Sequence, residues 1–191
     1  MSAPLLVLLG VSGSGKTSVG RILSRILDAP LVEADDLVEA ALGDTVATLV
    51  VAGDPRLPDA RREAARAALA SDGAIATLGA SQIEDPETAE LVRAARSAGA
   101  RVVELVADLA EVARREGLNA PRSVGLGAPR AMLALMIRAL REEYADVADS
   151  SVETSGLEPQ AIAEAIAREC RMTGDSRTPD SEVDPWQRRM I

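Results

Sequence analysis

Short apolar runs alternate along most of the chain with segments in which apolar residues recur every three or four positions. Such runs are typical of strands buried on both faces of a parallel sheet, and they occupy residues 4–10, 29–34, 73–79, 101–107 and 150–154. The periodic segments predict helices at residues 16–27, 35–42, 59–70, 86–99, 109–117, 130–147 and 159–170. The alternation predicts an α/β fold, a three-layer sandwich with a five-stranded parallel sheet and helices on both faces.

Two segments interrupt this alternation. Residues 117–129 are rich in glycine and proline and precede the longest predicted helix, whereas residues 172–191 are polar and show no apolar period. Residues 1–171 are therefore expected to form one domain. Residues 172–191, with Trp186 among them, are expected to be disordered in solution or to act as a docking arm.

The composition excludes several classes of function. The net charge of −9 argues against general binding to nucleic acid or to anionic membranes. The chain has no histidine, so acid–base chemistry must come from carboxylates, lysine, tyrosine or the substrate. Its single cysteine, Cys170, rules out an internal disulfide and a cysteine-based zinc site. No segment resembles a signal peptide or a membrane span, so a cytoplasmic protein is expected.

A glycine-rich loop joins the first predicted strand to the first predicted helix. It matches the pattern G-x-x-x-x-G-K-[S/T], in which backbone amides surround phosphate oxygens at the positive end of a helix. The lysine of this pattern reaches the β- and γ-phosphates, and the following hydroxyl binds Mg²⁺. The loop predicts a site for ATP and Mg²⁺, formed by Gly10, Ser12, Gly13, Ser14, Gly15, Lys16, Thr17 and Ser18.

The sequence around this loop resembles that of the shikimate kinases, which have a nucleoside-monophosphate-kinase-like P-loop fold. The loop and helix read GVSGSGKTSVGRILSRIL, and the next strand and helix read LVEADDLVE. The resemblance implies that Glu33 helps to hold Mg²⁺, and that Asp35 binds the substrate hydroxyls and takes the proton of the attacking one. The residues alone leave other roles open: Glu33 as a surface charge at a strand end, and Asp35 or Asp36 as an N-cap. For Asp36 capping is the preferred interpretation.

The resemblance continues through EVARREGLNAPRSVG, residues 111–125. It implies that Arg115 lies against the adenine and that Arg122 belongs to a lid, at about residues 117–129, that reaches over the phosphates. A lid arginine can neutralise the charge of a transferring phosphoryl group, and the flanking glycines suit a segment that opens and closes. The alternative is a solvated loop whose arginines are surface charges.

The acceptor side departs from the pattern of that family. Leu57 and Pro58 stand where the family has F-R, whose arginine binds the substrate's carboxylate, and Ala80 and Ser81 replace the last two residues of a G-G-G run. The first glycine of that run, which the resemblance places beside the substrate, is kept as Gly79.

Three arginines remain as candidates to bind a carboxylate bidentately. Arg61 lies one turn beyond Pro58, on nearly the same face if the helix has begun there, and Arg56 precedes it. Arg141 lies near the position of a second arginine of the family, but it is one residue nearer to the following tyrosine. The alternative is that Arg61 and its neighbour are paired with acidic residues on an exposed helix face.

Three functions are compatible with these features. The first is an ATP-dependent phosphotransferase of shikimate-kinase type, acting on a hydroxyl of shikimate or another hydroxy acid and serving aromatic amino-acid biosynthesis. The second keeps this chemistry with a different sugar acid, since the loop also resembles that of the gluconate kinases. The third is a nucleotide-binding protein without kinase activity that regulates a partner. A monomer or weak homodimer is expected.

Overall fold

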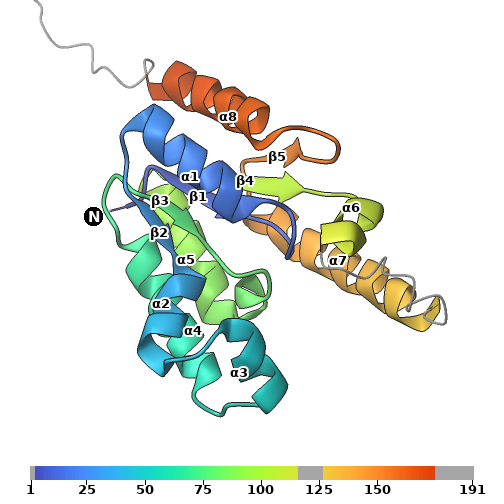
Figure 1. The fold of residues 1–191 in the computed structure, drawn as a ribbon. Helices are drawn as coiled ribbons and strands as arrows, with labels where there is room; N and C mark the ends of the chain where they lie inside the picture. The colour runs from blue at the N-terminus through green and yellow to red at the C-terminus, as the bar shows by residue number, and fades with distance from the viewer. Residues whose placement is uncertain (1–2, 116–126, 175–191) are drawn as a thin grey trace, which may run out of the picture.

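A parallel sheet lies between two layers of helices (Figure 1). The computed structural model describes residues 3–115 and 127–174. The elements in chain order are β1 (Leu6–Leu9), α1 (Lys16–Leu27), β2 (Leu31–Glu33), α2 (Ala34–Leu42), α3 (Val46–Ala52), α4 (Leu57–Leu69), β3 (Ile75–Thr77), the 3₁₀ helix η1 (Gln82–Glu84), α5 (Pro86–Ser97), β4 (Arg101–Val106), α6 (Leu109–Arg115), α7 (Gly127–Val147), β5 (Ser150–Glu153) and α8 (Pro159–Gly174).

The five strands run parallel in the order β2-β3-β1-β4-β5, which confirms the predicted sheet. Thr77, the last residue of β3, pairs with Leu8 of β1 and with Glu33, the last residue of β2. The segments that follow these three strands therefore leave the sheet at the same edge. Ligands of open parallel sheets bind beyond the carboxyl ends of the strands, where the chain turns to opposite faces.

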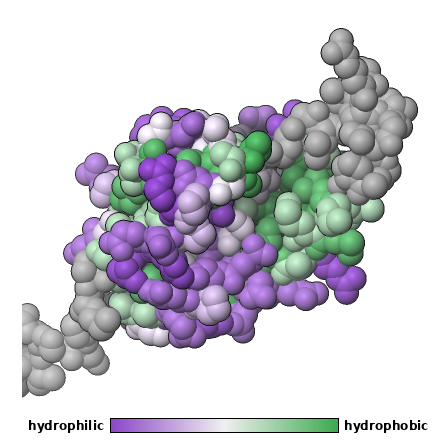
Figure 2. Space-filling model, turned by 90° about the horizontal axis from the view of Figure 1, so that it is seen from below, coloured by the Kyte–Doolittle hydropathy of each residue, from purple (hydrophilic) through white to green (hydrophobic). Residues whose placement is uncertain are grey.

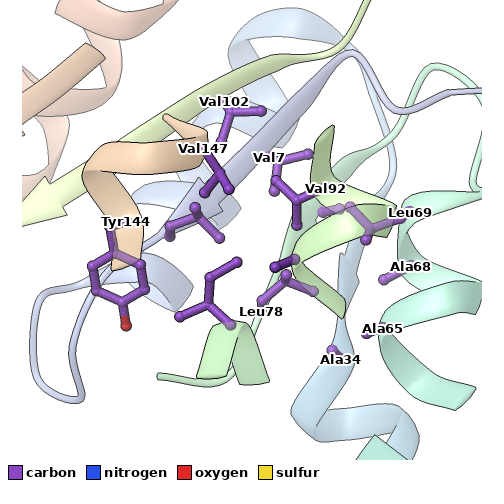
Figure 3. Packing of buried hydrophobic residues seen from close by; sticks show 14 of the residues in the cluster. Val7, Ala34, Ala65, Ala68, Leu69, Leu78, Val92, Val102, Tyr144 and Val147 are labelled. Atoms are coloured by element: carbon purple, nitrogen blue, oxygen red, sulfur yellow. The ribbon is translucent and has the colours of Figure 1, made fainter. Parts of the chain in front are cut away.

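Each face of the sheet buries its own apolar cluster. Because side chains alternate along a strand, Leu6 and Leu8 of β1 face α1 and α8, whereas Val7 and Leu9 face the opposite layer. In that layer α2, α4, α5 and α7 cover the sheet, as Figure 3 shows for Val7 and its neighbours. Tyr144 of α7 is the one aromatic residue of this cluster and is only 1% exposed. Aliphatic side chains and alanine supply the rest.

The prediction that Asp35 or Asp36 caps α2 is wrong. The helix begins at Ala34, and its N-cap is Glu33, whose side chain makes no capping hydrogen bond. Asp35 and Asp36 lie in the first turn. Carboxylates are favoured there by the positive end of the helix dipole without having to accept a capping bond. The side chain of Asp35 is therefore available for another role.

Helix α3 was not expected from the sequence. Its residues, VATLVVA, include several β-branched side chains, which have low helix propensity. The side chain of Thr45 caps the helix by accepting a hydrogen bond from the backbone N–H of Thr48, and Leu49 packs into the core. A local cap and tertiary packing thus override propensity.

Other boundaries differ by a few residues from those predicted. Helix α7 begins three residues early, at Gly127, because Pro129 is compatible with the first turn of a helix. Helix α8 continues past Cys170 to Gly174. Most of the predicted lid, including Arg122, and the segment 175–191 lie outside the described residues.

Part of the surface of α7 is apolar. Met132, Leu135 and Met136 are exposed, and Figure 2 shows this hydrophobic region over α7. Within residues 3–115 and 127–174, no helix combines the length and the apolar character needed to cross a membrane.

Candidate active site

The loop between β1 and α1 lies tightly against the sheet. A Cβ at Gly10 would lie 2.5 Å from the carbonyl oxygen of Leu105 and 2.6 Å from Ser14 Oγ. The φ angle of Gly10 is +144°, a conformation that other residues rarely adopt. No side chain fits there, so the loop can pass close to β4 only with glycine at this position. The ammonium of Lys16 donates hydrogen bonds to the carbonyl oxygens of Gly10 (2.7 Å) and Val11 (3.2 Å). The cation is thus held over its own loop.

A cavity of about 440 Å³ opens at this loop. The predicted loop residues from Ser12 to Ser18 line it, together with two predicted residues from elsewhere, Asp35 and Arg115. The amino end of α1 favours anions at one side of the cavity. The lining is completed by residues for which the sequence predicted no role: Val19, Thr154, Leu157, Pro159 and Ile162.

The segment after β5 supplies most of these unpredicted residues. Leu157, Pro159 and Ile162 form an apolar side of the cavity that suits a nucleoside base rather than phosphate. Thr154 is anchored by its hydroxyl, which donates to the carbonyl oxygen of Val106 (2.9 Å). The rule that ligands bind beyond the carboxyl ends of parallel strands points to this segment once the strand order is known.

Arg115 reaches the loop from the end of α6. Its guanidinium donates to the carbonyl oxygen of Gly13 (2.7 Å) and forms an ion pair with Glu111 (2.7 Å). Hydrogen bonds from Arg114, assisted by the charge of Arg115, lower the pKa of Glu111 to about 2. Glu111 therefore stays ionised at neutral pH and keeps Arg115 beside the cavity, where the resemblance places a contact with adenine.

Asp35 is the carboxylate of the cavity. Its Oδ1 is buried and has no hydrogen-bond partner within the described ranges. Burial raises the pKa of Asp35, while the nearby positive charges of Lys16 and Arg61 act in the opposite direction. A Cβ at Gly79 would collide with Asp35 Oδ1, so the absence of a side chain at Gly79 makes room for this carboxylate.

Glu33 lies at the end of β2, two residues before Asp35. Its Oε1 is also buried without a hydrogen-bond partner among the residues that the structure describes, although Glu33 does not line the cavity. Within the described residues, no group of three or more acidic, cysteine or histidine side chains is placed so that it could hold a metal ion. Mg²⁺ commonly uses only one or two protein ligands and completes its shell with phosphate oxygens and water. Thr17 lines the cavity, and Thr17 and Glu33 stay the predicted ligands.

The arginines around α4 have different surroundings. Arg56 pairs with Asp54 (2.7 Å), and Arg62 pairs with Asp59, so both have local acidic partners. Arg61 is half-buried, and its Nε has no hydrogen-bond partner in the described part of the chain. The helix begins at Leu57, so Arg61 lies one helical turn after Pro58, which stands where the resemblance predicts an arginine. The predicted ion pairing with acidic residues of the helix is therefore found for Arg62, whereas Arg61 Nε has no hydrogen-bond partner among the described residues.

Arg141 lies on α7 and is not among the residues that line the cavity. Its Nε is 3.5 Å from Oε1 of Glu104, a residue of β4 whose side chain is only 7% exposed. Burial raises the pKa of Glu104, and the charge of Arg141 partly offsets this. A substrate carboxylate would therefore compete with Glu104 for this arginine.

The fold and the loop together define a class of protein. A parallel sheet ending in a phosphate-binding loop, a lysine over that loop and a half-buried carboxylate beside it are the features of a P-loop kinase that acts on small molecules. Buried oxygens without partners at Asp35 and Glu33 fit a site that takes a hydroxyl and a metal ion.

Comparisons with known proteins identify the family. The family model SKI, shikimate kinase, matches residues 12–171. A shikimate kinase of Thermobifida fusca is 38% identical over 175 residues, covering 91% of this chain and 99% of that protein. One of Streptomyces coelicolor is 36% identical, covering 86% and 94%. The solved shikimate kinase of Acinetobacter baumannii, in complex with shikimate, has the same fold, with a TM-score of 0.74 at 19% identity, covering 93% of this chain and 97% of that one.

The chain belongs to the shikimate kinase family. This confirms the family resemblance, the P-loop kinase fold and the expected use of ATP and Mg²⁺. The gluconate-kinase and inactive-regulator alternatives are not favoured.

Proposed function

We propose that this chain transfers the γ-phosphoryl group of ATP to a hydroxyl of shikimate. Two curated relatives that the chain matches over most of its length are named shikimate kinases. The observation that carries the proposal is the position of Asp35, whose carboxylate lines the phosphate cavity within reach of the charges of Lys16 and Arg61. A half-buried base on which two cations act suits a reaction in which a hydroxyl loses its proton beside a phosphate.

In this reaction the acceptor oxygen bonds to the γ-phosphorus, and the bond from that phosphorus to the β–γ bridging oxygen breaks. ADP leaves with the electron pair of the broken bond, and the hydroxyl proton passes to Asp35. Because burial raises the pKa of Asp35, its carboxylate is a stronger base than that of an exposed aspartate. Lys16 stabilises charge on the transferring group, and Arg122, outside the described residues, has the same proposed role.

Nucleotide and metal would occupy the loop side of the site. Backbone amides from Gly13 to Lys16 would bind the phosphates, and Arg115 would lie against the adenine near Pro159. Bound Mg²⁺ neutralises charge on the β- and γ-phosphate oxygens. Thr17 and Glu33 would be its protein ligands.

On the acceptor side we assign the substrate's carboxylate to Arg61. A guanidinium binds a carboxylate through parallel hydrogen bonds, and Arg61 Nε has no hydrogen-bond partner in residues 3–115 and 127–174. Arg141 would be a second contact, available to the extent that the substrate displaces Glu104. Gly79 would let the acceptor approach Asp35. A cytoplasmic location and a monomeric or weakly dimeric state stay predictions.

The test is an ADP-release assay with ATP and Mg²⁺, run with shikimate and, in parallel, with gluconate. We expect turnover with shikimate and little with gluconate. Calorimetry under the same conditions measures ATP binding independently of turnover. Clear ATP binding without turnover on any acceptor would contradict the proposal and favour the nucleotide-binding regulator.

A further inference from the structure

The loop after β3 contains a buried amide to which the motifs assign no role. Gln82 is only 3% exposed, although an amide side chain buried without partners is costly. Both of its polar atoms have partners from different elements. Its Oε1 accepts a hydrogen bond from the backbone N–H of Gly79 (2.5 Å), and its Nε2 donates to the backbone carbonyl oxygen of Arg61 (2.9 Å).

These partners leave only one orientation for the amide. The N–H of Gly79 can only donate and the carbonyl oxygen of Arg61 can only accept, so an exchange of the amide oxygen and nitrogen would break both bonds. The backbone N–H of Gln82 also donates to the carbonyl oxygen of Gly79 (3.1 Å), which closes a tight turn. The side chain of Gln82 therefore connects this turn to α4 and fixes the distance between Gly79 and the backbone of Arg61.

Both ends of this connection belong to the acceptor side of the site. Gly79 borders Asp35 so closely that a side chain at Gly79 would collide with its Oδ1. Arg61 is a charge that acts on Asp35, and its Nε has no hydrogen-bond partner among the described residues. A shift of α4 relative to the turn would change the distance between the carboxylate and the guanidinium, which must contact the same acceptor molecule.

We propose that Gln82 is a positioning residue for the acceptor site, because it holds the turn that borders Asp35 against the helix that carries Arg61. This inference rests on the proposed function and deepens it. Gln82 does not line the cavity, and its side chain bonds to the backbone of Gly79 and Arg61, so it acts through the placement of Arg61. The expected signature is a change in acceptor binding without a change in nucleotide binding.

The test replaces Gln82 by methionine, which has a similar length but makes neither hydrogen bond. We expect Gln82→Met to raise the KM for shikimate by about tenfold, equivalent to about 1.4 kcal/mol, and to leave the KM for ATP unchanged. The matched control is Thr88→Val. Thr88 is also buried and donates its hydroxyl hydrogen bond to Asp85 at the start of α5 (3.0 Å), so its loss should lower the melting temperature without changing either KM.

A double-mutant cycle separates positioning from general structural damage. If Gln82 acts through Arg61, Gln82→Met should add little to the shikimate KM once Arg61 is replaced by alanine. Additive effects, or equal changes in both KM values, would overturn the inference. Gln82→Glu is the second variant should Gln82→Met fail to fold. It keeps an acceptor for Gly79 N–H, loses the donor to the Arg61 carbonyl once ionised, and should raise the shikimate KM selectively.

The wild-type protein in the same assay distinguishes the two levels of the proposal. Turnover of shikimate by the wild type, with an unchanged shikimate KM in Gln82→Met, would refute the positioning role and leave the proposed function intact. Absence of turnover by the wild type would refute the proposed function and, with it, the role of Gln82.

Discussion

The phosphate-binding loop and the acceptor side of the site are built in different ways. The loop is one continuous segment, from Gly10 to Ser18, that joins a central strand to a helix. The acceptor side gathers Asp35 from α2, Arg61 from α4 and Gly79 from the loop after β3. The loop is a local structure, whereas the acceptor side exists only after distant segments have packed together.

This difference explains why the two sides depart from the family pattern to different degrees. Phosphate binding uses backbone amides and a helix end, which require a fixed backbone path and therefore particular glycines. Carboxylate binding requires one guanidinium at the right place, and an arginine one turn along the same helix can reach a similar place. The loop keeps its pattern, whereas Pro58 stands where the family resemblance predicts an arginine.

The largest expected effect belongs to the nucleotide side. Lys16→Ala should reduce kcat by about 10³–10⁵-fold, the range attributed to a cation that stabilises a transferring phosphoryl group. ATP affinity measured by calorimetry should fall as well. The control is Arg21→Ala, at an exposed position of α1. Retention of both ATP affinity and turnover in Lys16→Ala would show that the loop does not bind the phosphates of the reacting nucleotide.

Asp35→Asn tests the residue at which the two sides meet. Loss of a general base should lower kcat by about 10²–10⁴-fold, with less effect on ATP affinity. Turnover by the wild type should rise with pH through the pKa of Asp35. Since burial raises that pKa above 3.8, the midpoint should lie above that of an ordinary aspartate.

The same substitution should also stabilise the fold at neutral pH. Because the pKa of Asp35 is higher in the folded state, the folded protein binds more protons than the unfolded chain from pH 3.8 up to that raised pKa. The free energy of unfolding therefore decreases as the pH rises through this window. The amide introduced by Asp35→Asn does not ionise, so thermal unfolding of this variant at pH 7 should show a higher Tm. A lower Tm would mean that the charges of Lys16 and Arg61 outweigh the cost of burial.

The smallest of these effects separates two adjacent arginines on the acceptor side. Arg61→Ala should raise the KM for shikimate by a factor equivalent to about 1.5–3 kcal/mol, the value of a hydrogen bond to a charged group, with the KM for ATP unchanged. Arg62→Ala is the matched control, since Arg62 pairs with Asp59 on the exposed side of the same helix. Equal effects of the two substitutions, or an equal change in both KM values, would remove Arg61 from the acceptor site.

Much of the fold followed from the sequence, because apolar runs and helical periods are local patterns. All five strands lie where the runs predict them, and the phosphate-binding loop follows the first strand as its motif requires. The errors occur where tertiary contacts decide. Helix α3 forms from β-branched residues, and α2 begins at Ala34 without a side-chain cap.

The acceptor side shows the limit of a linear pattern most clearly. The sequence predicted Arg61, or Arg56 in its place, as the carboxylate ligand, with Arg141 as its partner. Ion pairs engage Arg56 with Asp54 and Arg141 with Glu104, while Arg61 Nε has no hydrogen-bond partner among the described residues. Gln82 carried no motif, because its importance depends on two backbone atoms that come from different elements.

The sequence by itself determined the strand-loop-helix unit that binds phosphate, since its backbone path depends on neighbouring glycines and one strand. It also determined which side chains can take part in the reaction: because the chain has no histidine, the base available beside the lysine is a carboxylate. Only the tertiary structure decided that Asp35 is half-buried next to Gly79, that the charge of Arg61 acts on it, and that Gln82 connects the turn at Gly79 to the helix of Arg61. Burial and charge proximity depend on how β2, β3 and α4 pack, and that packing is a property of the whole sheet.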